Sequence, residues 1–158
     1  MPISDADVTA RLSELGLELP PPPQALAAYV PCVVHGGIAW VAGQIPMLDG
    51  TPVSPGIVGD GVEPEDAAAA AARAALQSLS VLRAELGSFD AIERIVQVSV
   101  FVASTPAFTG HPQVANGASE LLVDVLGDDG RHARAAVGVP SLPLGSCVEV
   151  VVTAAVRG

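Results

Sequence analysis

The chain contains 158 residues, half of them apolar, with one Trp, one Tyr and three Phe, and its formal net charge is -10. This length fits one domain with an aliphatic core, since domains usually run to roughly 100–200 residues. The seven basic residues are scattered through an acidic chain, which argues against nucleic-acid binding, because phosphates require a basic patch.

The sequence carries no signal for export or membrane insertion. Its N-terminal residues lack the basic and apolar regions of a signal peptide. No apolar run approaches the roughly 20 residues that a membrane-spanning helix needs. Cys32 and Cys147 form no CxxC pair, so we expect two buried, reduced thiols. These features predict a soluble, cytoplasmic protein.

Residues 1–23 are expected to be an appendage on the outside of a single domain that spans residues 1–158. Residues 4–15 form a predicted helix that begins after the capping residue Ser4. The apolar positions at helical spacing are Val8, Leu12 and Leu15. The proline run 20–23 then acts as a stiff spacer.

Two strand-like runs follow the proline spacer. Residues 29–35 and 38–44 are joined at Gly36 and Gly37, and two glycines between β-type runs predict a hairpin. The loop 45–61 is rich in Pro and Gly and is long enough to border a cleft.

Residues 64–86 give the clearest helix signal in the chain. Pro64 suits the first helical position, and the six consecutive alanines have the highest helix propensity. Gly87 is placed to form the C-terminal cap. The alanines predict a close approach to another surface, which we expect to be the sheet.

The side chains of residues 92–102 alternate in the pattern of a strand. Residues 108–126 form a predicted second helix. By strict alternation, the strand positions that meet the helices are Val96, Val98, Val100 and Val102. Phe101 lies on the opposite side, which favours packing of that side on a neighbouring subunit. The apolar stripe of the second helix is Val114, Ala118, Leu121 and Val125, with Pro112 tolerated in its first turn.

The last segment, 131–157, reads as two β-type runs around a Pro/Gly turn, which predicts a hairpin-like end to the sheet. Arg134 lies inside the first run and shares a strand face with Ala136. A guanidinium among alanines and valines requires an anionic partner if it is buried. That partner is either a carboxylate of the protein or the anion of a ligand.

The predicted order of elements is ββ–α–β–α–ββ. Each helix between strands of one sheet makes a right-handed crossover, so both helices cover the same face. This predicts an α+β fold with a mixed sheet. Apolar side chains on the other face predict burial against sister subunits.

Four segments resemble the YjgF/RidA family of reactive-intermediate deaminases, also described as L-PSP-type endoribonucleases. They are AYVPCVVHGGIAWVAGQIP, IERIVQVSVFVAS, VANGASELL and HARAAVGVPSLPLGSCVEV, so the resemblance covers the chain from about Tyr29 to Arg157. It implies a chorismate-mutase-like fold and a homotrimer with an inner barrel of sheets and clefts between subunits. It also implies hydrolysis of 2-aminoacrylate-like enamines or imines without a metal or organic cofactor.

The resemblance assigns the site residues as well. Arg134 matches the arginine that holds the substrate carboxylate, and a planar guanidinium suits that task. Glu149 matches the first of two alternating carboxylates on the last strand and is the candidate catalytic acid or base. The residues that match positions lining or rimming the cleft are Tyr29, Gly43, Gln44 and Asn116.

This sequence departs from the family pattern at three positions. Ala42 replaces a serine before the Gly-Gln pair, Ala136 replaces a cysteine after the arginine, and Val151 replaces the second glutamate, which orients the water. His35, His111 and His132 lack metal-ligand spacing, so no metal is expected.

Each assigned residue also has a structural interpretation, and three functions remain open. Arg134 and Glu149 are alternatively partners in ion pairs at a subunit interface, and Tyr29 and Asn116 serve packing or local hydrogen bonding. The leading hypothesis is a trimeric hydrolase of small carboxylate-bearing imines. The alternatives are a non-catalytic binder of small carboxylates in the same cleft, favoured by Val151, and a ribonuclease or translation inhibitor, which the acidic charge opposes.

Overall fold

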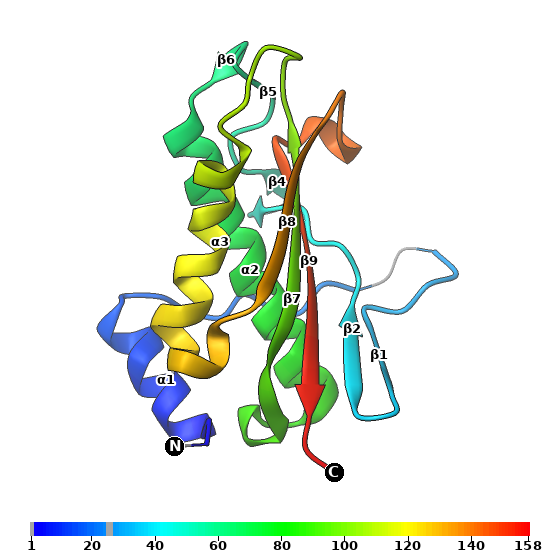
Figure 1. The fold of residues 1–158 in the computed structure, drawn as a ribbon. Helices are drawn as coiled ribbons and strands as arrows, with labels where there is room; N and C mark the ends of the chain where they lie inside the picture. The colour runs from blue at the N-terminus through cyan, green and yellow to red at the C-terminus, as the bar shows by residue number, and fades with distance from the viewer. Residues whose placement is uncertain (1, 25–26) are drawn as a thin grey trace.

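The computed structural model describes residues 2–24 and 27–158 (Figure 1). Its centre is a five-stranded sheet with the strand order β1-β2-β9-β7-β8. The main elements are α1 (Asp5–Glu14), β1 (Cys32–His35), β2 (Ile38–Val41), α2 (Pro64–Leu86), β7 (Ile92–Ala103), α3 (His111–Leu126), β8 (Ala133–Val139) and β9 (Val148–Val156). Helices α2 and α3 lie on the same face of the sheet, which confirms the predicted α+β arrangement.

Short elements occupy the connections. Two small sheets pair β3 (Met47–Leu48) with β4 (Thr51–Pro52) and β5 (Ile57–Val58) with β6 (Gly61–Val62). The 3-10 turns are η1 (Phe89–Ala91), η2 (Gly127–Gly130) and η3 (Pro143–Gly145). Within the described residues, no helix combines the length and the apolar character needed to cross a bilayer.

The hairpin of β1 and β2 turns at Gly36 and Gly37, as predicted, and both glycines have positive φ. The regular strands are shorter than expected, because β1 begins at Cys32 and β2 ends at Val41. Gln44 lies beyond β2 and forms an isolated antiparallel bridge with Val150 of β9. The chain therefore leaves β2 but returns to the sheet at the residue that borders the candidate cleft.

Helix α2 has the predicted bounds, with Pro64 in its first turn and Gly87 in the left-handed conformation at its end. The alanine-rich face of α2 was expected to pack closely on the sheet. It packs more closely on α3. A Cβ atom at Gly117 of α3 would overlap the backbone carbonyl of Ala68, so the glycine lets the two helices touch.

Helix α3 begins at His111, three residues later than expected, because residues 108–110 belong to the preceding loop. Pro112 is in its first turn, as predicted. The whole predicted stripe is buried: Val114, Ala118, Leu121 and Val125.

The prediction for β7 was wrong at Val96, which is 39% exposed. The pairing of β7 with β9 shifts register between Ile95 and Gln97, and such a bulge breaks strict alternation. As a result Ile95, not Val96, points into the core, while Val98 and the later valines are buried as expected.

The prediction of a hairpin-like end to the sheet was also wrong. β8 and β9 do not pair with each other, because β7 lies between them, parallel to β8 and antiparallel to β9. The reason is that α3 returns the chain so that β8 runs parallel to β7. The Pro/Gly segment 140–147 then crosses to the other side of β7.

The face of the sheet opposite the helices is uncovered within the described chain. On this face Val33 is the cross-strand neighbour of Trp40, and Phe101 is the cross-strand neighbour of both Glu149 and Val137. Val33, Trp40 and Val137 are each about half exposed. The largest aromatic side chain of the protein is thus on this bare face.

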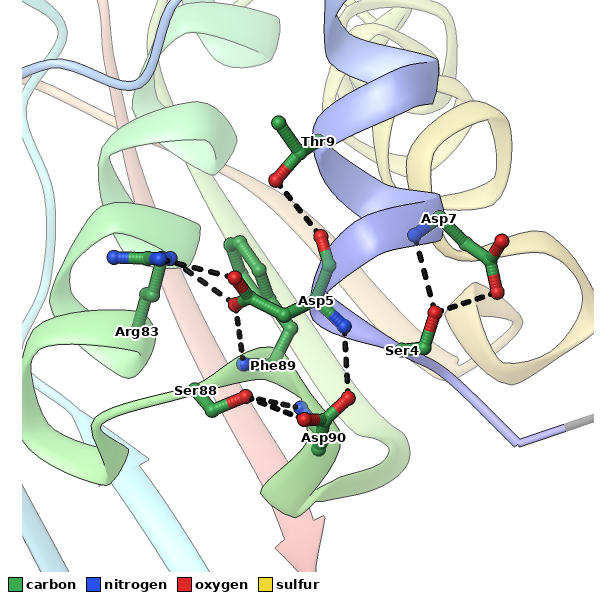
Figure 2. A network of polar contacts seen from close by, with 8 residues as sticks. All are labelled: Ser4, Asp5, Asp7, Thr9, Arg83, Ser88, Phe89 and Asp90. Atoms are coloured by element: carbon green, nitrogen blue, oxygen red, sulfur yellow. Dashed lines mark hydrogen bonds and ion pairs between the residues drawn. The ribbon is translucent and has the colours of Figure 1, made fainter.

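Helix α1 is attached to the end of α2 through Asp5 (Figure 2). The Asp5 carboxylate accepts hydrogen bonds from the Arg83 guanidinium at 3.0 and 3.2 Å and from the Phe89 backbone N–H at 3.0 Å. Ser4 caps the helix, and Val8 and Leu12 are buried as predicted, whereas Leu15 is 45% exposed because the helix ends at Glu14.

The Asp5 cluster predicts an acid-dependent loss of stability. The Arg83 hydrogen bonds, and then the Phe89 N–H, lower the pKa of Asp5, so this stabilisation is complete above the ordinary carboxyl pKa of about 3.9. It is lost as pH falls through the lowered value. Asp5→Asn should reduce the free energy of unfolding at about pH 7, measured by urea denaturation, and the difference should vanish in strong acid.

Glu14→Gln on the same helix is the control for Asp5→Asn, because neither ion pair found among the described residues involves Glu14. An Asp5→Asn effect that persists undiminished below both pKa values would show that ionisation of Asp5 is not its cause.

Candidate functional site

Arg134 projects from the edge strand β8 toward α3. Its cross-strand neighbour is Val98, which is buried under the helices, so Arg134 is on the helix-covered side of the sheet. Its Nη1 donates hydrogen bonds to Asn116 Oδ1 at 2.8 Å and to Ser119 Oγ at 3.2 Å. Both acceptors are on α3, one helical turn apart, which places them on one helix face.

The guanidinium of Arg134 is held by neutral groups. It is exposed, and within residues 2–24 and 27–158 the ion pairs involve other arginines, Arg83 and Arg131. Among the same residues its Nε and Nη2 atoms have no hydrogen-bond acceptor. That edge of the guanidinium presents two parallel N–H donors, the arrangement that binds a carboxylate or phosphate in bidentate fashion.

Ser119 links Arg134 to His132. Ser119 Oγ is 2.9 Å from His132 Nε2, and His132 Nδ1 is 2.6 Å from the Gly130 carbonyl oxygen. The carbonyl can only accept, so Nδ1 carries the hydrogen and Nε2 accepts from the Ser119 hydroxyl. Burial lowers the pKa of His132, the hydrogen bond to Gly130 opposes this, and the charge of Arg134 lowers the pKa further. The net lowering favours the neutral ring near pH 7.

A second group of predicted site residues surrounds a separate pocket. Tyr29, Gly43 and Gln44 line a hollow of about 220 Å³ that also includes Gln77 of α2 and Leu144 of η3. Tyr29 is 55% exposed at its rim. The structure therefore brings these three residues together, away from Arg134 and Asn116.

Gln44 is buried and fully engaged inside the chain. Its Nε2 donates to the Ala42 carbonyl at 2.9 Å, and its Oε1 is 3.4 Å from Gln77 Nε2. Gln77 also binds the Ile45 carbonyl and the Met47 N–H. The two glutamines fix the backbone after β2, so Gln44 shapes the pocket through its main chain.

Glu149 is half-buried and lies against Gly43. A Cβ atom at position 43 would overlap the Glu149 carboxylate, so glycine is the residue that makes room for it. Burial raises the pKa of Glu149. Its cross-strand neighbour is Phe101, which places the carboxylate on the uncovered face of the sheet.

Arg134 and Glu149 lie on opposite faces of the sheet in one chain. Gln44 is on the helix-covered face, because it pairs with the buried Val150 and its side chain contacts Gln77 of α2. Arg134 is beside α3 under the helix layer, whereas Glu149 is on the bare face beside Gly43. β8 is the outer strand and β9 lies beyond β7. No rotation of side chains brings the guanidinium and this carboxylate onto one small substrate within a single copy.

Cys147 does not supply a nucleophile. Its thiol is buried and burial raises its pKa to about 11, so it is protonated at neutral pH and unreactive. Cys32 is likewise buried, and both cysteines are free, as expected. The described residues contain no group of three or more His, Cys, Asp or Glu side chains placed to hold a metal ion.

Ser119 and His132 were not among the predicted site residues. Their signal was present in part, because Asn116 and Ser119 are three residues apart on a predicted helix and therefore share a face. His132 lies two residues from Arg134 on what becomes the start of β8. What the sequence did not show is that α3 packs beside β8, which brings all four side chains together.

Comparisons with known proteins agree with this fold. Residues 9–156 match the family described as "YjgF/chorismate mutase-like, putative endoribonuclease". Protein TCP17 of Trypanosoma cruzi is 42% identical over 149 residues, covering 94% of this chain and 93% of that protein. Atu1372 of Agrobacterium tumefaciens, a protein of unknown function, has a crystal structure with a TM-score of 0.91 and 40% identity, covering 97% of this chain and 94% of that one.

A further solved structure is similarly close. A protein from Shewanella oneidensis, named as a "putative endoribonuclease", has a TM-score of 0.90 at 30% identity and covers 94% of this chain and 98% of its own. These relatives match nearly from end to end, so the likeness extends over the N-terminal helix as well as the sheet.

The raised pKa of Glu149 predicts a gain in stability on its removal. The folded chain holds this proton more tightly, so stability is unaffected below the ordinary pKa of about 4.3 and falls as pH rises through the raised value. Glu149→Gln should therefore raise the free energy of unfolding at about pH 7 and leave it unchanged at about pH 3.5, measured by urea denaturation with Trp40 fluorescence. A loss of stability at neutral pH would instead mean that the carboxylate is paired with a cation.

Proposed function

Because this chain belongs to the YjgF/RidA family, we propose that it hydrolyses small enamines or imines that carry a carboxylate, releasing an oxo acid and ammonia. The observation that supports this most directly is the Arg134 guanidinium, which is exposed and held by an amide and a hydroxyl without a carboxylate partner among the described residues. A fixed cation with two unused donors favours binding of a small anion. No metal or organic cofactor is part of this proposal.

The reaction that we propose relies chiefly on positioning. An imine carbon is already electrophilic, so holding its carboxylate against the Nε and Nη2 atoms of Arg134 fixes the carbon for attack by water. Water adds to the carbon, the C=N electron pair moves to nitrogen, and the carbinolamine then expels ammonia to leave the oxo acid. Val151 stands where the family has its second glutamate, so proton transfer has to come from another group.

We further propose that the site is completed between copies of the chain in a homotrimer. Arg134 and Asn116 lie at the β8 edge of the sheet, whereas Tyr29, Gly43 and Gln44 line a pocket beyond the end of β2, and Glu149 lies against Gly43. A cleft between two copies would let the first group of one chain meet the second group of its neighbour. The bare apolar face with Trp40 and Val137 supports such an assembly.

The cellular setting follows from the same features. Two free, buried cysteines are typical of a reducing compartment, so we propose that the reaction occurs in the cytoplasm. The net charge of -10 disfavours RNA as the substrate. Ribonuclease activity, for which related proteins are named, is therefore the third candidate function.

A non-catalytic binder of small carboxylates is the second candidate. The observation that favours it is the distance in the fold between Arg134 and Glu149, together with Val151, which removes the family's water-orienting carboxylate. Such a protein would use the Arg134 donors in the same way but would release its ligand unchanged.

The first prediction for function concerns Arg134→Ala. An oxidase or dehydratase that releases an amino-acid imine is mixed with the protein, and ammonia release is followed above the spontaneous rate. The unsubstituted protein should accelerate release, and Arg134→Ala should lower the acceleration by about 10²-fold, because the imine carbon is no longer positioned.

Arg131→Ala is the matched control, since Arg131 is an exposed arginine just before β8 that pairs with Asp128 at 3.2 Å. It should keep the acceleration. If the unsubstituted protein does not accelerate hydrolysis but is stabilised against heat by small carboxylates, and Arg134→Ala abolishes that shift, the protein is a binder. If the protein shows neither acceleration nor stabilisation, both the hydrolytic and the binding function of Arg134 are excluded.

The second prediction for function concerns assembly. Val137→Asp introduces a charge at a residue that is 47% exposed on the bare face, and a buried unpaired charge opposes association. Light scattering should show a trimer for the unsubstituted protein and smaller species for the variant, with hydrolysis lost in parallel. Leu48→Asp, at a 52% exposed residue outside the five-stranded sheet, should leave the trimer intact. A monomeric unsubstituted protein would contradict the shared cleft.

A further inference from the structure

We propose that Ser119 and His132 form the proton relay of the Arg134 site, with Ser119 contacting the attacking water and His132 accepting the proton through Ser119. This inference rests on the proposed imine hydrolysis and supplies the proton acceptor that the loss of the second glutamate at Val151 leaves open.

The direction of the hydrogen bonds supports a relay. His132 Nδ1–H donates to the Gly130 carbonyl at 2.6 Å, which fixes the tautomer and orients the ring. His132 Nε2 therefore presents its lone pair to the Ser119 hydroxyl at 2.9 Å. A histidine oriented by an acceptor behind it and facing a hydroxyl in front is the arrangement by which an imidazole removes a proton from an oxygen.

The relay ends beside Arg134, the residue proposed to bind the substrate carboxylate. Ser119 Oγ accepts from Arg134 Nη1 at 3.2 Å, while the Nε and Nη2 atoms of Arg134 are the donors assigned to the substrate carboxylate. A substrate held there places its imine carbon next to the carboxylate carbon, within reach of a water on Ser119. Asn116 Oδ1, 2.8 Å from the same Nη1, fixes the guanidinium without competing for the free edge.

The surroundings of His132 keep it available as a base. Ser119 and His132 are both partly buried, and burial is the main cause that lowers the His132 pKa. The charged group acting on the ring is Arg134 of β8. Arg94 of β7 and Arg131 line a shallow pocket with His132.

The turn η2, which precedes His132 in the chain, carries two carboxylates. They are Asp128, which is paired with Arg131, and Asp129. Without the Arg131–Asp128 pair, these groups are the cations Arg94 and Arg134 and the carboxylate Asp129, which favours a neutral ring at neutral pH.

The proton balance closes without any further reagent. As the water oxygen bonds to the iminium carbon, a water proton passes to Ser119 Oγ and the Ser119 proton passes to His132 Nε2. The C=N electron pair moves to nitrogen. His132 returns its proton through Ser119 to the amino nitrogen, the C–N bond breaks as the carbonyl forms, and the hydroxyl proton passes to the departing ammonia. The net change is iminium plus water to oxo acid plus ammonium.

The experiment compares His132→Gln and Ser119→Ala with the unsubstituted protein across pH, using an imine released by an amino-acid oxidase. The rate of the unsubstituted protein should fall as pH drops through the lowered pKa of His132, which is below the ordinary imidazole value of about 6.5. Both variants should lose about 10²-fold in rate, and the acid limb of the pH profile should disappear in His132→Gln. Ser119→Thr, which keeps a hydroxyl, should restore much of the rate lost in Ser119→Ala.

A second serine–histidine pair in the same chain provides the matched control. Ser104 Oγ is 3.2 Å from His111 Nε2 at the start of α3, next to Gly138 rather than Arg134. Ser104→Ala and His111→Gln should leave both the rate and the pH profile unchanged. Thermal denaturation of every variant identifies those that fail to fold.

The outcomes separate this inference from the proposed function. If the unsubstituted protein accelerates hydrolysis, Arg134→Ala abolishes it, and His132→Gln retains rate and acid limb, the relay is wrong and the function stands. If the unsubstituted protein does not accelerate hydrolysis, both fall. Nitrogen NMR of the His132 ring tests the geometry directly, and a hydrogen on Nε2 instead of Nδ1 at neutral pH would overturn the relay.

Discussion

The packing of α2 and α3 on one face of the sheet determines where every functional group of this protein can lie. The contact is close because Gly117 allows α3 to touch the backbone of α2 at Ala68. It leaves the opposite face, with Trp40 and Val137, without cover in a single chain. A bare apolar face of this kind marks an interaction surface, which supports the proposed assembly of several copies.

The same one-sided packing divides the polar residues. Arg134 meets Asn116 and Ser119 at the seam between β8 and α3, whereas Glu149 and the pocket of Tyr29 and Gln44 lie elsewhere. The arginines outside the two ion pairs of the described residues differ in what holds them. Arg11, Arg73, Arg94 and Arg157 donate to backbone carbonyls, whereas Arg134 donates to two side-chain oxygens of α3. The structure stabilises Arg134 with neutral oxygens, which hold the guanidinium in place and leave its charge available.

In the proposed relay, the histidine behind Ser119 gives this seam an acid–base group. Burial keeps the His132 ring neutral, and the Gly130 carbonyl fixes its tautomer. A neutral imidazole facing a hydroxyl differs in its pH response from a carboxylate such as Glu149, whose pKa burial raises. In the proposed relay, a helix and an edge strand place His132 where it takes the role that the family resemblance expects of a carboxylate at position 151.

The sequence by itself determined the bounds of α2, the β1–β2 turn at two glycines and the strand face that Arg134 shares with Ala136, because these depend on local propensity and on periods of 2 and 3.6 residues. Only the tertiary structure decided that a bulge at Val96 shifts β7 and that β7 separates β8 from β9. It also decided that Asn116, Ser119 and His132 surround Arg134 while Glu149 does not. The physical reason is that contacts between distant segments follow from how a helix docks on an edge strand, which no local pattern in either segment encodes.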